Sequence, residues 1–293
     1  MKYSIFIGCQ IPARVPQYER AVRAVFNKLN VDLIDNRRFN CCGYPMRNRD
    51  PLAFLLSSVR NLALAERSGD KMMVLCQCCF GSLKKAANIM QEKGALQDKV
   101  NEILKKERLS YTGRVEVYHL LSVLYHDVGI KRLKEEIERP FNGDLKIAAH
   151  YGCHALRPSK VTMFDDPVEP RIFDEMVEIT GARSPDWTQK LECCGAPAMG
   201  INNDLSISLM KKKLESAKDA GADYICTACP YCQMQFDITQ QMVVSGKVGQ
   251  DRLASILYPQ LLGLSMGIDD EKLGIHMNRI DIGTVRSYLK KEV

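Results

Sequence analysis

Two short stretches of this chain each contain a pair of adjacent cysteines followed by a glycine and, two residues later, a proline. They are Cys41-Cys42-Gly43-Tyr44-Pro45 and Cys193-Cys194-Gly195-Ala196-Pro197. Adjacent cysteines are poor disulfide partners, because closing the bond strains the peptide between them. A neighbouring thiol pair before a permissive glycine is more typical of ligands offered to several metal ions. The chain must therefore fold so that each pair can meet further ligands.

The cysteines repeat in the same order in the two halves of the chain. Each half of the 293 residues contains Gly-Cys, then the Cys-Cys-Gly stretch, then Cys-X-X-Cys, and matching cysteines lie 144 to 153 residues apart. A repeat of that length indicates a duplicated domain rather than a short solenoid unit. We therefore predict two domains, residues 1–142 and 143–293, with a boundary near Phe141–Asp144.

Apolar runs with strand character alternate with helical periodicity in both halves. The predicted strands are residues 2–8, 31–34, 71–75, 115–117, 145–150 and 223–225. The predicted helices are residues 18–29, 51–66, 83–108 with an interruption near Gly94, 170–180 and 205–220. This alternation predicts an α/β fold, with two tandem domains related by a pseudo-twofold axis and a small, mostly parallel sheet flanked by helices in each. The key cysteines follow strands, and the carboxyl ends of parallel strands are where sites form.

Composition and charge are those of an ordinary globular protein. Hydrophobic residues make up 46% of the chain and charged residues 26%, and the formal net charge is +6. Lys84-Lys85 and Lys211-Lys212-Lys213 fall on predicted helices and are interpreted as solvated faces. No basic stripe is interleaved with aromatic residues, so the sequence does not favour nucleic-acid binding.

We expect a cytoplasmic protein without a membrane span. The longest apolar-rich stretch, residues 256–268, is interrupted by Pro259 and is too short to cross a bilayer. Residues 1–9 have the pattern of a strand and not of a signal peptide. Because thiols stay reduced in the cytoplasm, so many cysteines point to metal binding before disulfides.

Each half offers five thiols in a pattern that suits a polynuclear metal cluster. A structural zinc ion needs four ligands, whereas several irons each need a terminal ligand and a thiolate can bridge two of them. The spacing differs from the compact ferredoxin motif, in which four cysteines lie within about a dozen residues. Cys78 and Cys226 are left over, and each is either an alternative ligand or a buried, inert thiol.

These motifs resemble the cysteine-rich CCG domain. Two tandem copies over nearly the whole chain resemble the HdrB family, the cysteine-rich subunits of the heterodisulfide reductase of methanogenic archaea. Further similarity lies in residues Tyr151–Pro158, Cys229–Gln235 and Pro259–Gly267. The resemblance implies that each domain holds one non-cubane [4Fe-4S] cluster.

Carried onto this chain, the resemblance implies two ligand sets. The first cluster would use Cys9, Cys41, Cys42, Cys76 and Cys79. The second would use Cys153, Cys193, Cys194, Cys229 and Cys232. We choose Cys76 and Cys79 because they keep the Cys-X-X-Cys spacing. Cys78 is the substitute there, and Cys226 with Cys229 is the rival pair in the second half.

The resemblance also implies an activity, the reduction of the mixed disulfide of coenzyme M and coenzyme B in methanogenesis, with this chain in the catalytic role. Cleaving a disulfide takes two electrons, so a substrate held between two clusters would receive one from each. His154 directly follows Cys153 and is a candidate proton donor. Arg157 and Lys160 are candidates for attracting the acidic coenzymes, and His150 is expected in the core.

The chain contains no Gly-X-Gly-X-X-Gly fingerprint for flavin and no ferredoxin motif. The resemblance therefore assigns electron delivery to partners within heterodisulfide reductase: the flavin-containing HdrA and the ferredoxin-like HdrC, with a hydrogenase or formate dehydrogenase further off. One alternative is the CCG iron–sulfur component of a lactate or glycolate oxidase or of a thiol:fumarate reductase. Another is a zinc-stabilised binding module without catalysis.

Overall fold

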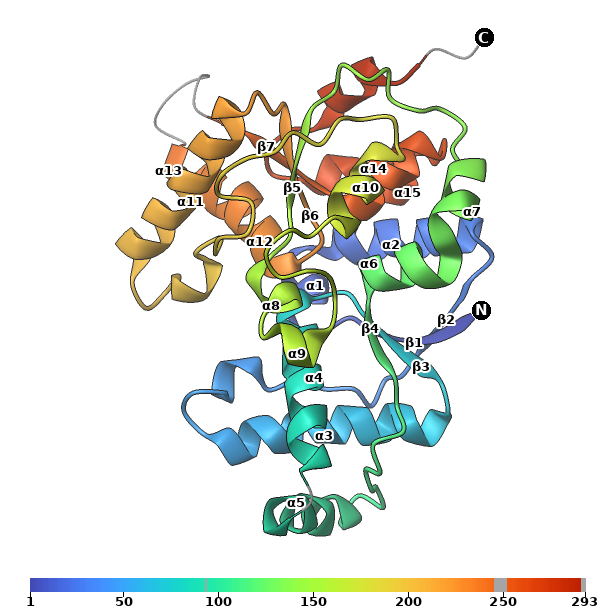
Figure 1. Cartoon of the computed structure of the whole chain (residues 1–293), viewed down its shortest axis with the longest axis vertical. Coiled ribbons are helices and arrows are strands. Elements are labelled where there is room, and N and C mark those ends of the chain that lie inside the picture. Colours follow the sequence, from blue (N-terminus) through green and yellow to red (C-terminus); the bar gives the residue numbers. More distant parts are fainter. Residues whose placement is uncertain (93, 245–251, 291–293) are drawn as a thin grey trace.

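Two parallel β-sheets form the framework of the computed structural model, which describes residues 1–92, 94–244 and 252–290 (Figure 1). The first sheet has the order β2-β1-β3-β4. Its strands are β1 (Lys2–Phe6), β2 (Asp32–Asp35), β3 (Lys71–Val74) and β4 (Val117–His119). All its pairings are parallel. Parallel strands need a crossover connection, and the intervening helices supply it.

The second sheet has the order β5-β6-β7, again with parallel pairings. Its strands are β5 (Ile147–His150), β6 (Tyr224–Thr227) and β7 (Ala254–Leu257). The predicted α/β class, with tandem domains built on small parallel sheets, is confirmed. Strand β7 was not predicted, because it runs directly into helix α14 (Tyr258–Ser265) within one apolar stretch.

The helices of the first half cover its sheet and position its cysteines. They are α1 (Gln10–Arg14), α2 (Pro16–Lys28), α3 (Pro51–Ser68), α4 (Gln77–Gln91), α5 (Ala95–Lys105), α6 (Leu120–Ser122) and α7 (Ile130–Glu135), with a π-helical turn, η2, over Val123–Gly129. Helix α4 begins earlier than the predicted residue 83, so Cys78 and Cys79 lie in its first turn. The predicted interruption near Gly94 separates α4 from α5.

The second half follows the same plan with shorter helices. They are α8 (Cys153–Leu156), α9 (Ser159–Thr162), α10 (Ile172–Glu178), α11 (Asn203–Asp219), α12 (Pro230–Gln233), α13 (Gln240–Val244) and α15 (Asp270–Leu273), with a π-helical turn, η4, over Met234–Thr239. Helices α3 and α11 begin alike: Asp50 accepts from the Ala53 N–H at 2.9 Å, and Asn202 accepts from the Leu205 N–H at 3.0 Å. Such caps satisfy donors that the first helical turn leaves free.

The two halves pack extensively on each other. Helix α2 of the first half packs against α14 and α15 of the second, and α4 packs against α8 and α9. Figure 1 shows the first sheet below α2 and the second above it, with α1, α8 and α12 between them. The expected boundary at residues 142/143 falls between β4 and β5, and its position stays a prediction.

Within the described ranges, with their gaps at residues 93, 245–251 and 291–293, no helix is both long enough and apolar enough to cross a membrane.

Candidate metal centre

The predicted cysteines gather where strands of the two sheets end. Cys9 follows β1, Cys76 follows β3, Cys153 follows β5 and Cys229 follows β6 within two or three residues. Since parallel strands share one carboxyl edge, each sheet brings two of its cysteine-bearing loops together there.

In the first half, five thiols form a continuous series of sulfur contacts. Cys9 hydrogen bonds with Cys41, and Cys41 with Cys42. Cys42 then contacts Cys79, which contacts Cys76. These are the five residues predicted as one ligand set, and the structure brings them together.

The second half repeats this series. Cys153 hydrogen bonds with Cys193, and Cys193 with Cys194. The Cys194 and Cys232 sulfurs lie 3.6 Å apart, and Cys232 contacts Cys229. These are the residues predicted as the second ligand set.

The two series meet at the junction between the halves. The sulfurs of Cys76, Cys78 and Cys229 all lie within 4.8 Å of one another. Cys76 and Cys229 occupy matching positions in the two halves. The last cysteine of one series therefore contacts the last cysteine of the other. Together they form what we call the thiol series, which runs from Cys9 to Cys153 through the middle of the molecule.

The two surplus cysteines have different surroundings. Cys78 lies inside the junction and contacts both Cys76 and Cys229. Cys226 lies in the central strand β6, fully buried, and burial alone raises the pKa of its thiol. Among the residues that the structure describes, no other thiol shifts the pKa of Cys226, which does not favour the rival pair Cys226 and Cys229.

Gly43 and Gly195 explain why each cysteine pair is followed by glycine. Their φ angles are +83° and +85°, in the left-handed region that favours glycine. A Cβ at Gly43 would lie 2.8 Å from the Phe54 carbonyl oxygen, and one at Gly195 would lie 2.5 Å from that of Ser206. The N–H of each glycine also donates to the sulfur of the first cysteine of its pair. The Gly43 N–H donates to Cys41 and the Gly195 N–H to Cys193, both at 3.4 Å.

These donors make the first cysteine of each pair the most acidic thiol of its loop. Hydrogen bonds from Cys42, Cys9 and the Gly43 N–H lower the pKa of Cys41. Hydrogen bonds from Cys153, Cys194 and the Gly195 N–H do the same for Cys193. Donors stabilise the thiolate, which is the form that binds metal. The same physical cause therefore acts at matching positions of both halves.

His154, the predicted proton donor, lies between the two halves. Its Nδ1 is 3.6 Å from the Cys78 sulfur and 3.5 Å from the Cys153 sulfur. Its Nε2 is 3.4 Å from Nη1 of Arg47, which can only donate. Nε2 is therefore assigned as the acceptor and Nδ1 as the protonated nitrogen. Burial lowers the pKa of His154, so the ring is neutral at pH 7.

His150 was expected in the core, and it is buried at the end of β5. The sequence pattern did not predict that its Nε2 lies 3.2 Å from the Cys232 sulfur. Burial lowers its pKa well below the usual value, so it approaches the thiol as a neutral ring. This contact arises because β5 and β6 pair in parallel, which brings His150 at the end of β5 close to the segment after β6 that contains Cys232.

Lys213 was interpreted as part of a solvated lysine run, and for this residue the interpretation is wrong. Its side chain is 1% exposed, while Lys211 and Lys212 are exposed. The ammonium donates to the Gln189 carbonyl and to the Glu192 carbonyl at 3.0 Å. It therefore holds the loop that leads into Cys193.

Arg157 and Lys160, predicted to attract an acidic substrate, are both exposed. They flank the start of α9, beyond the helix that carries Cys153 and His154. The structure shows no partner for either among the residues it describes.

The donor set fits an iron–sulfur cluster in each half. Each half gathers five sulfurs. The ligand groups found among the described residues contain no carboxylate, and one of them adds the imidazole of His150 to Cys194 and Cys232. Five thiols, one more than a tetrahedral zinc ion accepts, suit several irons.

Comparisons with known proteins agree with this geometry. The cysteine-rich CCG domain matches residues 3–84 and 147–237. The HdrB component of the ferredoxin/F420H2-dependent CoB-CoM heterodisulfide reductase of Methanosarcina acetivorans is 38% identical over 95% of this chain and 94% of its own length. The 8-methylmenaquinol:fumarate reductase membrane anchor subunit of Wolinella succinogenes is 32% identical over 96% and 97%.

A solved structure has a similar fold. A hypothetical protein from Helicobacter pylori superposes with a TM-score of 0.75 over 96% of this chain, at 17% identity. The present chain spans about half of that protein, 52% of its length. At this identity the likeness concerns the fold alone.

Proposed function

The chain belongs to the HdrB family of cysteine-rich CCG proteins, and from this premise we propose that it is the disulfide-reducing component of a CoB-CoM heterodisulfide reductase. The observation that supports this most is the meeting of the two thiol series at Cys76 and Cys229. Two centres that adjoin can act on the two sulfurs of one disulfide.

Each half would hold one non-cubane [4Fe-4S] cluster. The ligands of the first are proposed to be Cys9, Cys41, Cys42, Cys76 and Cys79. The ligands of the second are proposed to be Cys153, Cys193, Cys194, Cys229 and Cys232. The contiguous sulfur contacts in each set support this assignment, and the isolation of Cys226 argues against the rival pair.

The overall step is R–S–S–R′ plus two electrons and two protons, giving two thiols, RSH and R′SH. When bound, each cluster supplies or passes on one electron. The residues of this chain would bind the substrate at the junction, exclude water and hold a proton. His154 holds its proton on Nδ1, which faces the Cys78 and Cys153 sulfurs, and Arg47 orients the ring through Nε2. The neutral ring cannot give up this proton without gaining another, so we propose that His154 acts as the proton donor by taking up a solvent proton at Nε2 while it passes the Nδ1 proton to a product thiolate.

The approach to the junction carries aromatic and basic groups. The Tyr44 ring packs edge-on against His154 at 5.1 Å, and Arg47 lies over Tyr44 at 5.0 Å. The substrate coenzymes are acidic, and Arg47 places a permanent positive charge beside His154. Arg157 and Lys160 add charge at the surface.

Electrons would come from partner proteins of the same complex. We propose the flavin-containing HdrA and the ferredoxin-like HdrC, with a hydrogenase or formate dehydrogenase further off, in the cytoplasm. The relatives that are components of heterodisulfide reductases support this assembly.

The test combines metal analysis with an assay. Anaerobically prepared protein should contain about eight irons per chain, four for each cluster. Cys194→Ala should abolish reduction of the coenzyme M–coenzyme B disulfide and lower the iron content, while Cys226→Ala, the matched buried cysteine, should retain both. Two zinc ions and no iron, or full activity in Cys194→Ala, would contradict the proposal.

A second candidate is a component of a fumarate-reducing complex, which the Wolinella succinogenes relative favours. It would use the same clusters to pass electrons without binding a disulfide. Electron paramagnetic resonance distinguishes the two. Adding the heterodisulfide to the oxidised protein should produce a new signal only if the disulfide binds at the clusters.

A further inference from the structure

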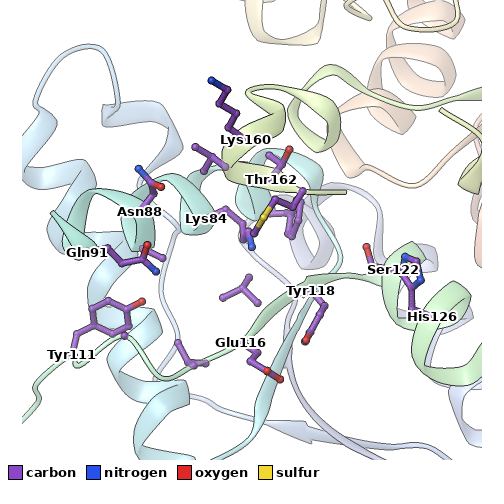
Figure 2. Close-up of a pocket in the computed structure, with 17 residues that line it drawn as sticks. Lys84, Asn88, Gln91, Tyr111, Glu116, Tyr118, Ser122, His126, Lys160 and Thr162 are labelled. Carbon is purple, nitrogen blue, oxygen red and sulfur yellow. The ribbon is translucent and has the colours of Figure 1, made fainter. Parts of the chain in front are cut away.

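A cavity of about 570 Å³ lies at the junction of α4, β4 and α9, apart from the thiol series (Figure 2). This volume falls within the range of small-molecule sites. Helix α4 and strand β4 belong to the first half and α9 to the second, so a ligand in the cavity would touch both halves. Among its described lining residues there is no cysteine, and Phe80, next to Cys79, connects the cavity wall to the thiol series.

Lys84 is the residue that gives this cavity a chemical preference. Figure 2 shows its ammonium extending from α4 into the cavity. The side chain is partly buried, and within the described parts of the chain its ammonium has no hydrogen bond or ion pair. Burial lowers the pKa of Lys84, with no neighbouring charge to offset the lost hydration. A charge withdrawn from water without a partner is unfavourable, so an anion that entered the cavity would bind there.

The other charges around the cavity do not supply that partner. Glu116 also lines it, but its carboxylate pairs with Lys71 at 3.2 Å and points away from Lys84 in Figure 2. Lys160 stands on the rim from the second half and reaches outward. Among the described residues around the cavity, the charge that lies inside it without a partner is therefore positive.

The walls combine apolar and polar surface in about equal measure. The apolar part comes from Phe80, Ala87, Val115, Val117 and Val161. The polar part comes from Asn88, Gln91, Tyr111 and Ser122. Walls that offer both polar groups and apolar surface suit a small organic anion, whose charged head and apolar body need both, better than an inorganic ion alone.

We propose that this cavity is a second ligand site, which binds a small organic anion with its carboxylate or phosphate head on Lys84 and its short apolar body against the Phe80 and Val115 wall. The proposal does not depend on the iron–sulfur assignment, because no proposed cluster ligand takes part.

The test uses the full chain, purified anaerobically with its metal content intact. Thermal unfolding is followed with increasing hexanoate, n-butyl phosphate, inorganic phosphate or hexanamide. A ligand that binds the folded protein and not the unfolded chain raises the unfolding temperature, and the rise grows with the ratio of its concentration to its dissociation constant. We expect hexanoate or n-butyl phosphate to stabilise the protein, inorganic phosphate to do so more weakly, and the neutral hexanamide not to do so. Which of the two organic anions binds more tightly identifies the preferred head group.

Variants on α4 locate the site. Lys84→Gln should weaken binding of the organic anions at least tenfold, and Lys85→Gln, its exposed neighbour, should not change it. Asn88→Asp, one helical turn along and exposed, should also weaken binding, because a carboxylate there would compete for Lys84. It tests the proposal independently if Lys84→Gln does not fold. Equal responses of Lys84→Gln and Lys85→Gln, equal stabilisation by hexanamide, or no stabilisation by any probe at 20 mM would overturn the proposal.

Discussion

Lys213 gives the most direct test of how the second cysteine loop is held. Its buried ammonium bonds the carbonyls of Gln189 and Glu192 and lies 4.7 Å from the centre of the Trp187 ring. Lys213→Met removes these contacts and keeps a linear side chain of similar length. The loop from Gln189 to Glu192 then loses two hydrogen bonds from α11, while the Gln189 N–H still donates to the Ser216 hydroxyl of the same helix.

The magnitude can be worked from these contacts. Two buried carbonyls that lose a charged donor cost about 1.5 kcal/mol each, and a desolvated cation–π contact contributes about 2 kcal/mol. Against this, burial lowers the pKa of Lys213 from 10.5 to about 8, which means that keeping the ammonium charged costs about 3 kcal/mol. The variant should therefore lose about 2 kcal/mol of unfolding free energy.

The assay is urea unfolding of anaerobic protein, followed by circular dichroism, with iron analysis of the same samples. Lys212→Met is the matched control, because Lys212 is exposed on the same helix and should change stability by less than about 0.5 kcal/mol. Iron should fall in Lys213→Met because the loop leads directly into Cys193. If Lys213→Met were as stable as Lys212→Met and retained full iron, the role assigned to Lys213 would be refuted.

Three further changes test other parts of the structure. Burial lowers the pKa of His119 to about 4, so as the pH falls the unfolded chain binds a proton at this histidine before the folded protein does. The free energy of unfolding should therefore fall by about 2 kcal/mol between pH 7 and pH 5. Urea midpoints measured across this range should vary less in His119→Gln. Gly81→Ala would normally stabilise a helix, but the added Cβ would lie 2.8 Å from the His154 carbonyl oxygen. We therefore expect urea unfolding to show a loss of about 1–3 kcal/mol in the free energy of unfolding. A gain in stability would show that α4 and α8 can separate freely. Cys76→Ala should lower the iron content while Cys78→Ala leaves it at about eight per chain, and the reverse result would exchange their roles.

Much of the fold could be predicted because the relevant signals are local. Apolar runs that stop at Cys9, Cys76 and Cys153 mark strand ends, and parallel strands bring such ends to one edge. The duplication then predicts the second ligand set from the first. Strand β7 escaped prediction because no turn residue separates it from α14.

What could not be predicted depends on which side of an element faces the core. Lys84 and Lys213 each belong to a run of lysines; Lys213 is buried and Lys84 partly buried, while a neighbour of each is exposed. Composition does not distinguish the members of such a run. The approach of His150 to Cys232 is equally invisible in sequence, because 82 residues separate them and only sheet register brings them together.

The position of Cys76 against Cys229 has a consequence for the origin of the chain. In a symmetric dimer, a residue that touches its own counterpart must lie close to the twofold axis. Matching cysteines that meet at the junction are what a homodimeric ancestor with one cysteine-rich domain per protomer would leave after gene fusion. In such an ancestor every substitution near the axis would appear twice. Fusion would remove this constraint, which is consistent with Cys78 having Tyr231 at the matching position of the second half.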